Sequence, residues 1–239
     1  LGVQLVVLAI GAVAFLLLER RLGRLPAPAS VHERPGMGEA IREGLASVLA
    51  SSSMRSVAVI NVLVGLFYMG AFQVGLPLLL RELHGGSPAQ LAQLNTVHMI
   101  GVVVTTVWLL RMGDVERRGR ALLLGVGLGG IGLAGIALST SFATLLAFNL
   151  CWGVTGGLVM AMARTIMQEA APPDARGRVM AFFSLTLMGA GPLGALLSGL
   201  LVESLGVQLA LLLPAVTMMG CGLAVALLTG LWALRPATP

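Results

Sequence analysis

The chain of 239 residues contains no lysine, only ten acidic residues and two cysteines. Charged residues make up 10% of the sequence, whereas soluble globular domains contain about 25%. A soluble protein of this size could not hydrate so apolar a surface, which excludes that class. Cys151 and Cys221 lie inside apolar segments, away from any Cys-x-x-Cys pair or Cys/His cluster, which favours packing roles over a metal or redox site.

Apolar residues instead make up 57% of the chain, in long stretches that contain no charged residue. Most of these stretches are about 18–28 residues long, and about 20 helical residues cross a hydrocarbon core of about 30 Å. The arginines occupy separate connectors and form no continuous basic patch with interleaved aromatics, which argues against nucleic acid as a partner. The sequence therefore predicts an all-α protein that crosses the lipid bilayer several times.

The distribution of arginine predicts the orientation of these crossings. Arginines gather in 19–55, 111–120 and 164–178, whereas 139–142 and 203–206 contain none. Because basic residues collect in cytoplasmic loops, we expect the three arginine-rich ranges 19–55, 111–120 and 164–178 to face the cytosol, together with the C-terminus. Anionic lipid headgroups are the expected partners of these arginines.

The segments divide the chain into an N-terminal region and a bundle. We expect 1–18 to be the end of a transmembrane helix and the chain to be a fragment without its N-terminal part. A cytoplasmic connector with a short amphipathic helix is expected over 19–53, a six-helix bundle over 54–235 and a cytoplasmic tail over 236–239. The six helices are expected at about 54–80, 88–110, 121–138, 142–168, 176–203 and 207–234.

Local signals support several of these boundaries. Ser87 and Gln90 have the spacing of a capping box, with Pro88 at the first helical position. Hydroxyl side chains at 139–141 offer a cap in the middle of a charge-free stretch that is too long for one crossing. Gly206 is a plausible C-terminal stop for the helix before it.

Two connectors have unusual sequences. The first is a short loop with both charge signs, and its marked residues are Gly113, Asp114, Arg117, Arg118, Gly119 and Arg120. Such side chains can pair with helix ends and act as a latch, or they can simply anchor the loop in the cytosol. The second connector contains Pro172-Pro173 and then Asp174, Arg176, Gly177 and Arg178. We expect Asp174 to cap the next helix and to pair with Arg178 four residues later.

The helix after the second connector contains Gly191, Pro192, Gly194 and Gly199. Gly191, Ala195 and Gly199 fall on one stripe, and small residues at this spacing allow close approach of membrane helices. The proline removes a backbone donor and allows a bend. These features are typical of a helix that packs closely and moves.

At these residues the chain resembles the major facilitator superfamily. The Gly113–Arg120 loop is similar to the family's cytoplasmic signature loop, here between its eighth and ninth helices, although Gly113 adjoins Asp114 where the usual pattern is Gly-x-x-x-Asp. The second connector and the Gly-Pro-Leu-Gly helix resemble the eleventh helix of drug and siderophore exporters of the enterobactin and macrolide types. The resemblance implies the C-terminal half of a transporter in which two six-helix bundles rock about a central cavity.

The resemblance also implies which helices line the substrate pathway, namely the seventh, eighth, tenth and eleventh. Polar and aromatic residues within these helices are the candidates, since lipid tolerates them poorly: Asn61, Tyr68, His98, Asn149 and Trp152. The alternative for each is an interhelical hydrogen bond or a packing role. No Asp or Glu lies deep in an apolar segment, so a proton-coupling carboxylate is expected in the missing half.

The resemblance therefore implies export of a small amphipathic molecule, a drug or a siderophore, by a proton-coupled protein of the cell membrane. Its expected partners are the substrate, the bilayer and the N-terminal six-helix half. No cofactor, metal or catalytic residue is predicted, because the sequence lacks His-Glu-x-x-His and Gly-x-Ser-x-Gly motifs. A polytopic assembly subunit and a membrane-embedded enzyme remain the alternatives.

Overall fold

The computed structural model describes residues 37–113 and 115–233. The expected helix at 1–18, the connector up to residue 36 and the tail at 236–239 lie outside this part. The described residues are helical nearly throughout and contain no strand, and six of their helices are long and apolar enough to cross a membrane. The predicted all-α membrane bundle is thereby confirmed.

The first span runs from Ser52 to His84 and is not uniform. It consists of α3 (Ser52–Leu63), two π-helical segments η1 (Val64–Met69) and η2 (Ala71–Gly75), and α4 (Leu76–His84). The other spans are α5 (Pro88–Met112), α6 (Arg118–Ala137), α7 (Phe142–Ala170), α8 (Arg176–Leu205) and α9 (Val207–Leu228). The π turns are the main irregularity of the bundle, and such turns are frequent at functional sites.

The helix ends follow the local signals. Ser87 Oγ accepts a hydrogen bond from the backbone N–H of Gln90 at 3.3 Å, and Gln90 Oε1 accepts one from Ser87 N–H at 2.9 Å. This reciprocal pair is the predicted capping box of α5. Ser141 caps α7 in the same way, and Gly206, with a φ of 81°, separates α8 from α9. The predicted hydroxyl cap and glycine stop are therefore confirmed.

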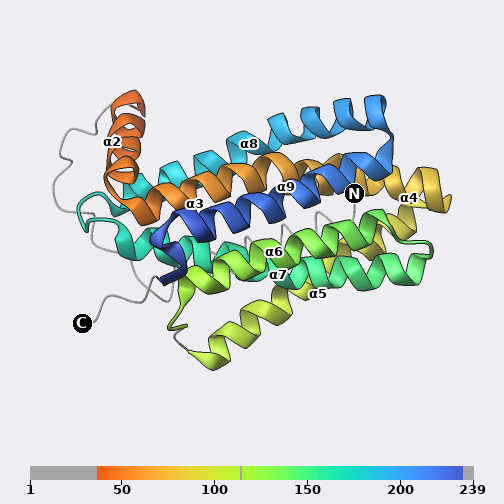
Figure 1. Cartoon of the computed structure of the whole chain (residues 1–239), viewed down its shortest axis with the longest axis horizontal. Coiled ribbons are helices and arrows are strands. Elements are labelled where there is room, and N and C mark those ends of the chain that lie inside the picture. The colour runs from red at the N-terminus through yellow and green to blue at the C-terminus, as the bar shows by residue number, and fades with distance from the viewer. Residues whose placement is uncertain (1–36, 114, 234–239) are drawn as a thin grey trace, which may run out of the picture. The chain divides into compact units, whose positions relative to one another are not determined.

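The chain passes back and forth along the bundle, so connectors gather at its two ends (Figure 1). At one end α5 and α7 finish while α3, α6 and α8 begin. Every arginine of the described residues except Arg81 belongs to this end. We call it the arginine-rich end. The short helix α2 (Met37–Ala50) also lies there, and it contacts α8 and α3.

Helix α8 packs tightly against the first span through small residues. A methyl group added at Gly194 would meet the backbone carbonyls of Gly65 and Leu66, and one added at Gly65 would lie 2.6 Å from Ala190 Cβ. At Gly199, in contrast, an added methyl would have no neighbour within 4 Å. The close contact with the first span therefore involves Gly194, whereas no described residue lies within 4 Å of a methyl group added at Gly199.

The difference between Gly194 and Gly199 has a geometric reason. Steps of four residues advance about 400° around a helix of 3.6 residues per turn, so a strict i+4 stripe drifts about 40° per step away from its partner. The buried face of α8 combines steps of four with a step of three, and it contains Val179, Phe183, Leu187, Ala190, Gly191, Gly194 and Ser198. Pro192 lies on the exposed face, and α8 continues through it as one helix.

Candidate functional site

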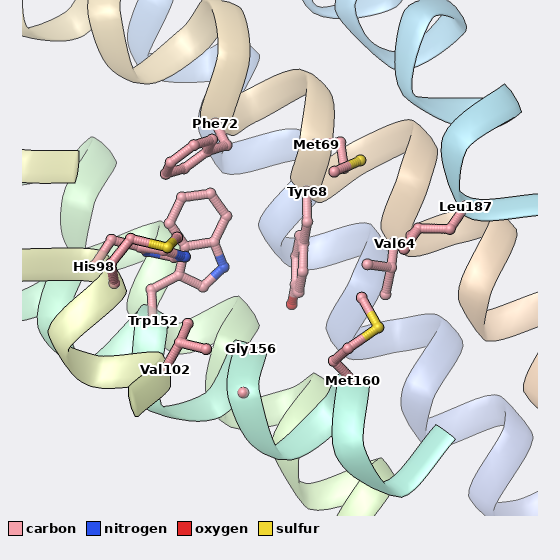
Figure 2. Close-up of a pocket in the computed structure, with 12 residues that line it drawn as sticks. Val64, Tyr68, Met69, Phe72, His98, Val102, Trp152, Gly156, Met160 and Leu187 are labelled. Atoms are coloured by element: carbon pink, nitrogen blue, oxygen red, sulfur yellow. The ribbon is translucent and has the colours of Figure 1, made fainter. Parts of the chain in front are cut away.

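A cavity of about 270 Å³ opens near the middle of the bundle (Figure 2). Its walls come from η1 and η2 of the first span and from α5, α7 and α8. It is lined by Val64, Tyr68, Met69, Phe72, His98, Met99, Val102, Trp152, Gly156, Gly157, Met160 and Leu187. None of these twelve residues is charged, so the site favours apolar and aromatic ligands.

The cavity has an aromatic wall centred on Trp152. The ring of Trp152 lies edge-on to Tyr68, with centroids 5.8 Å apart, and edge-on to His98 at 5.2 Å. Phe72 completes the group at 6.0 Å from Trp152 and 4.8 Å from His98. These distances are those of favourable aromatic pairs. The wall is therefore held in place by its own ring contacts, and in Figure 2 the rings of Phe72, His98 and Trp152 are grouped with Tyr68 beside them.

The π-helical segments position two of these rings. Tyr68 lies in η1 and Phe72 in η2, so both come from the irregular part of the first span. Tyr68 is further fixed because its hydroxyl donates to the carbonyl of Val126 in α6, at 2.8 Å. Its hydroxyl proton is thus already committed to the protein.

The polar atoms that remain around the cavity are few. His98 Nδ1 is buried and has no hydrogen-bond partner among the described residues. No group of three or more His, Cys, Asp or Glu side chains in the described part of the chain could hold a metal ion. What the arrangement can do chemically is to bind an apolar or aromatic body by dispersion and ring contacts.

The two predicted asparagines have a different role from the aromatic residues. Asn61 Nδ2 donates to the carbonyl of Phe183 at 2.9 Å and to Thr186 Oγ1 at 2.7 Å. Asn149 Nδ2 donates to the carbonyl of Leu94 at 2.7 Å. All three bonds join different helices, and neither asparagine lines the cavity of Figure 2. Of the five candidates, the structure brings together Tyr68, His98 and Trp152.

Sequence reasoning did not select several wall residues. Phe72 follows Tyr68 by four residues and Met160 follows Trp152 by eight, so helical spacing from a chosen aromatic could have found them. Met99 and Leu187 gave no such signal, because isolated apolar residues occur everywhere in these helices.

The first arginine-rich connector has contacts with two helices. Gly113 ends α5 with a φ of 74°, and Arg117 is exposed just before α6. Arg118 is buried and forms an ion pair with Glu169 near the end of α7. Gly119 is also buried. Asp114, the predicted acidic member of the latch, lies outside the described residues.

Arg120 contacts the C-terminal turn η3 (Gly230–Ala233). Its Nε donates to the carbonyl of Trp232 at 3.1 Å, and its guanidinium carbon lies 5.2 Å from the centroid of the Trp232 ring. Arg118 and Arg120 therefore join the start of α6 to different partners.

The second connector differs from its prediction. Asp174 does not cap α8, because Ala175 holds the cap position and makes no side-chain bond. Asp174 instead accepts through its backbone carbonyl from Arg178 Nη2 at 3.3 Å, and Arg178 forms its ion pair with Glu43 of α2 at 3.0 Å. The predicted Asp174–Arg178 salt bridge was therefore wrong, since Arg178 has a partner from far along the chain. Arg176 and Gly177 are exposed.

The spans that line the cavity lie within a region of the chain that matches a known protein family. The model of the Major Facilitator Superfamily matches residues 57–239, which include all the cavity residues. The chain belongs to the Major Facilitator Superfamily. With six helices able to span a bilayer, this member of the superfamily is a multi-pass protein of the cell membrane.

A relative among the curated proteins is the multidrug efflux pump Tap of Mycolicibacterium fortuitum. The chain is 27% identical to this pump over 177 residues, which cover 73% of the chain and 43% of the pump. The chain therefore spans less than half the length of that relative. No solved structure matches the chain significantly.

Proposed function

We propose that the complete protein is a transporter that exports a small amphipathic molecule by alternating access. The observation that carries this proposal is the cavity, which lies near the middle of four spans in a chain of the Major Facilitator Superfamily. The similarity to a multidrug efflux pump supports export as the direction.

The walls suggest the kind of substrate. Four aromatic rings and several aliphatic side chains suit a molecule with an aromatic or aliphatic body, and ring faces also attract cationic groups. The cavity of 270 Å³ is slightly smaller than the roughly 300–1,000 Å³ of drug-sized sites. In this proposal an N-terminal half supplies the facing wall and completes the site.

Proton coupling is the finer part of the proposal. Within residues 37–113 and 115–233, no acidic residue lines the cavity. Glu39 and Glu43 belong to the short helix α2, and the others lie in connectors or near the ends of spans: Glu82, Glu116, Glu169, Asp174 and Glu203. A carboxylate that exchanges protons within the membrane would therefore belong to the N-terminal half. His98 faces the cavity and is the ring in these walls that could respond to a proton.

Two ion pairs at the arginine-rich end link helices within this bundle, and such links are compatible with alternating access. The Arg118–Glu169 pair joins the start of α6 to the end of α7, and the Arg178–Glu43 pair joins α8 to α2. These two pairs link neighbouring helices at the arginine-rich end and make that end of the bundle stiffer. A stiff bundle can rock against a second bundle, which is the motion that alternating access requires.

Dye efflux tests the proposal. Cells that lack the gene, and cells that express it complete, are loaded with a fluorescent aromatic cation, and the rate of dye loss is measured. We expect the complete gene to accelerate dye loss, Trp152→Ala to abolish the effect, and Gly189→Ala, whose added methyl meets nothing within 4 Å, to preserve it.

Two results would contradict the proposal. Equal dye loss with and without the gene, over a panel of aromatic and aliphatic amphiphiles, would favour a polytopic assembly subunit. Normal export by Trp152→Ala would place the substrate site elsewhere.

A further inference from the structure

A second apolar hollow lies between α6 and α9, and neither helix contributes to the cavity of Figure 2. We call it the α6–α9 groove; it has a volume of about 610 Å³. The groove is lined by Leu123, Leu124, Gly127, Leu128, Ile131, Val216, Met219, Gly220, Gly222, Leu223, Ala226 and Trp232. Leu124, Leu128 and Ile131 are each more than half exposed along its edge, so the groove is open to the surroundings of the bundle.

Glycines create the floor of the groove. A methyl group added at Gly127 or at Gly220 would find no atom within 4 Å. At Gly130, a neighbouring glycine outside the groove, the side chain of Met219 fills the corresponding space. Gly127 and Gly220 therefore leave the space above them in the groove open to an occupant.

The length of the groove matches one leaflet of a membrane. On α6 it extends from Leu123 to Ile131, which at about 1.5 Å per residue is about 12 Å. On α9 it extends from Val216 to Ala226, or about 15 Å by the same rise. Half of a hydrocarbon core of about 30 Å is also about 15 Å. A hydrocarbon chain that enters from the arginine-rich end would fill the groove and stop near the bilayer centre.

A cation stands at the end of the groove where such a chain would begin. Arg120 lies one turn before Leu123 on α6, and its guanidinium is held over the Trp232 ring and by the Trp232 carbonyl. The bond to Trp232 uses one of the five guanidinium N–H groups, and Arg120 is half-buried, so its remaining donors have a fixed direction. Arg117 is exposed one turn earlier.

We propose that the α6–α9 groove is a binding site for an anionic phospholipid. One acyl chain lies in the groove over Gly127 and Gly220, and the phosphate accepts hydrogen bonds from Arg120, with Arg117 adding charge. Guanidinium groups bind phosphate oxygens with good geometry, and a basic residue near the surface strengthens anionic lipid binding by about fivefold. The site shares no residue with the transport cavity, so it stands apart from the proposed function.

Native mass spectrometry of the purified complete protein tests the site. The protein is released from detergent after exposure to equal amounts of phosphatidylglycerol and phosphatidylcholine, and the retained lipids are counted. We expect one phosphatidylglycerol to be retained preferentially. Arg120→Gln should lower its retention by about fivefold, since one arginine is lost. Gly127→Leu should abolish it by filling the groove.

Two control variants make the same kinds of substitution at positions outside the groove. Arg111→Gln removes an exposed arginine at the same end of the bundle, and Gly189→Leu adds the same side chain where an added methyl meets nothing within 4 Å. Both should retain phosphatidylglycerol as the unchanged protein does. Helix content is checked by circular dichroism, and Gly220→Leu, which fills the groove from α9, replaces Gly127→Leu if that variant loses helix.

The proposal would be overturned by equal retention of the two lipids. It would also be overturned if the groove-filling variant retained phosphatidylglycerol normally, or if Arg111→Gln lowered retention as much as Arg120→Gln, because retention would then reflect general charge. Added inorganic phosphate should not displace the lipid, since it has no chain to occupy the groove. Displacement by phosphate would show a simple anion site instead.

Discussion

The close crossing of α8 and the first span makes Gly194→Ala the most informative change. The added methyl would lie 2.6 Å from the carbonyl oxygen of Gly65 and 2.9 Å from the carbonyl carbon of Leu66, and it would be closer still to the Leu66 oxygen. Ordinary contact begins at 3.4 Å, so the two helices must separate by roughly 1 Å. The obstacles are backbone atoms, which cannot turn aside as a side chain can.

The cost follows from packing. Inserting a methylene into a packed core typically costs about 1–3 kcal/mol. Replacing glycine by alanine in a helix returns up to about 1 kcal/mol through helix propensity. The free energy of unfolding should therefore fall by about 1–2 kcal/mol, and export should fall with it if α8 moves against the first span.

Reversible unfolding of the purified complete protein in mixed micelles, with increasing sodium dodecyl sulfate, measures this difference. Gly189→Ala is the matched control, because it adds the same methyl to the same helix where no atom lies within 4 Å. The control should be unchanged or slightly more stable. Equal stability of Gly194→Ala and Gly189→Ala would refute the close crossing at Gly194.

Three further changes test contacts at other levels. Glu169→Gln removes the ion pair to Arg118. Because the Glu169 side chain is 46% exposed, the free energy of unfolding should fall by no more than about 1 kcal/mol, while dye export slows. Unchanged export would argue against a latch. Tyr68→Phe loses the bond to Val126 and should lower unfolding free energy by about 0.5–1.5 kcal/mol; a neutral effect would contradict a buried bond. Asn149→Ala should destabilise by about 1–3 kcal/mol without changing which dyes are exported, and altered dye preference would place Asn149 in the site.

Much of the bundle was predictable because its determinants are local. A span needs only enough consecutive apolar residues, and the caps at Ser87 and Ser141 depend on side chains within three residues of the helix start. The π-helical segments of the first span were not predicted, since nothing in the hydrophobic pattern of 64–75 distinguishes them from an α-helix.

Partners distant in sequence were harder to find than spans. Arg178 was assigned to Asp174, which is four residues away, but its ion-pair partner is Glu43, more than a hundred residues earlier. The residues that line the cavity also divide into those that could be predicted and those that could not. Aromatic residues such as Tyr68 and Trp152 could be selected by type, because they are rare in this chain, whereas Met99 could be found only from the packing of α5.

Protection of a cysteine introduced at Gly156 tests the central claim most directly. Gly156 lines the cavity, and an added side chain there has open space around it. In the complete protein with Cys151→Ser and Cys221→Ser, Gly156→Cys should react with a small maleimide, and an exported dye should slow this reaction. Gly189→Cys, which lies outside the cavity, should react at the same rate with and without dye. If dye leaves the reaction at position 156 unchanged while export continues, the cavity between the first span, α5, α7 and α8 is not where the substrate binds.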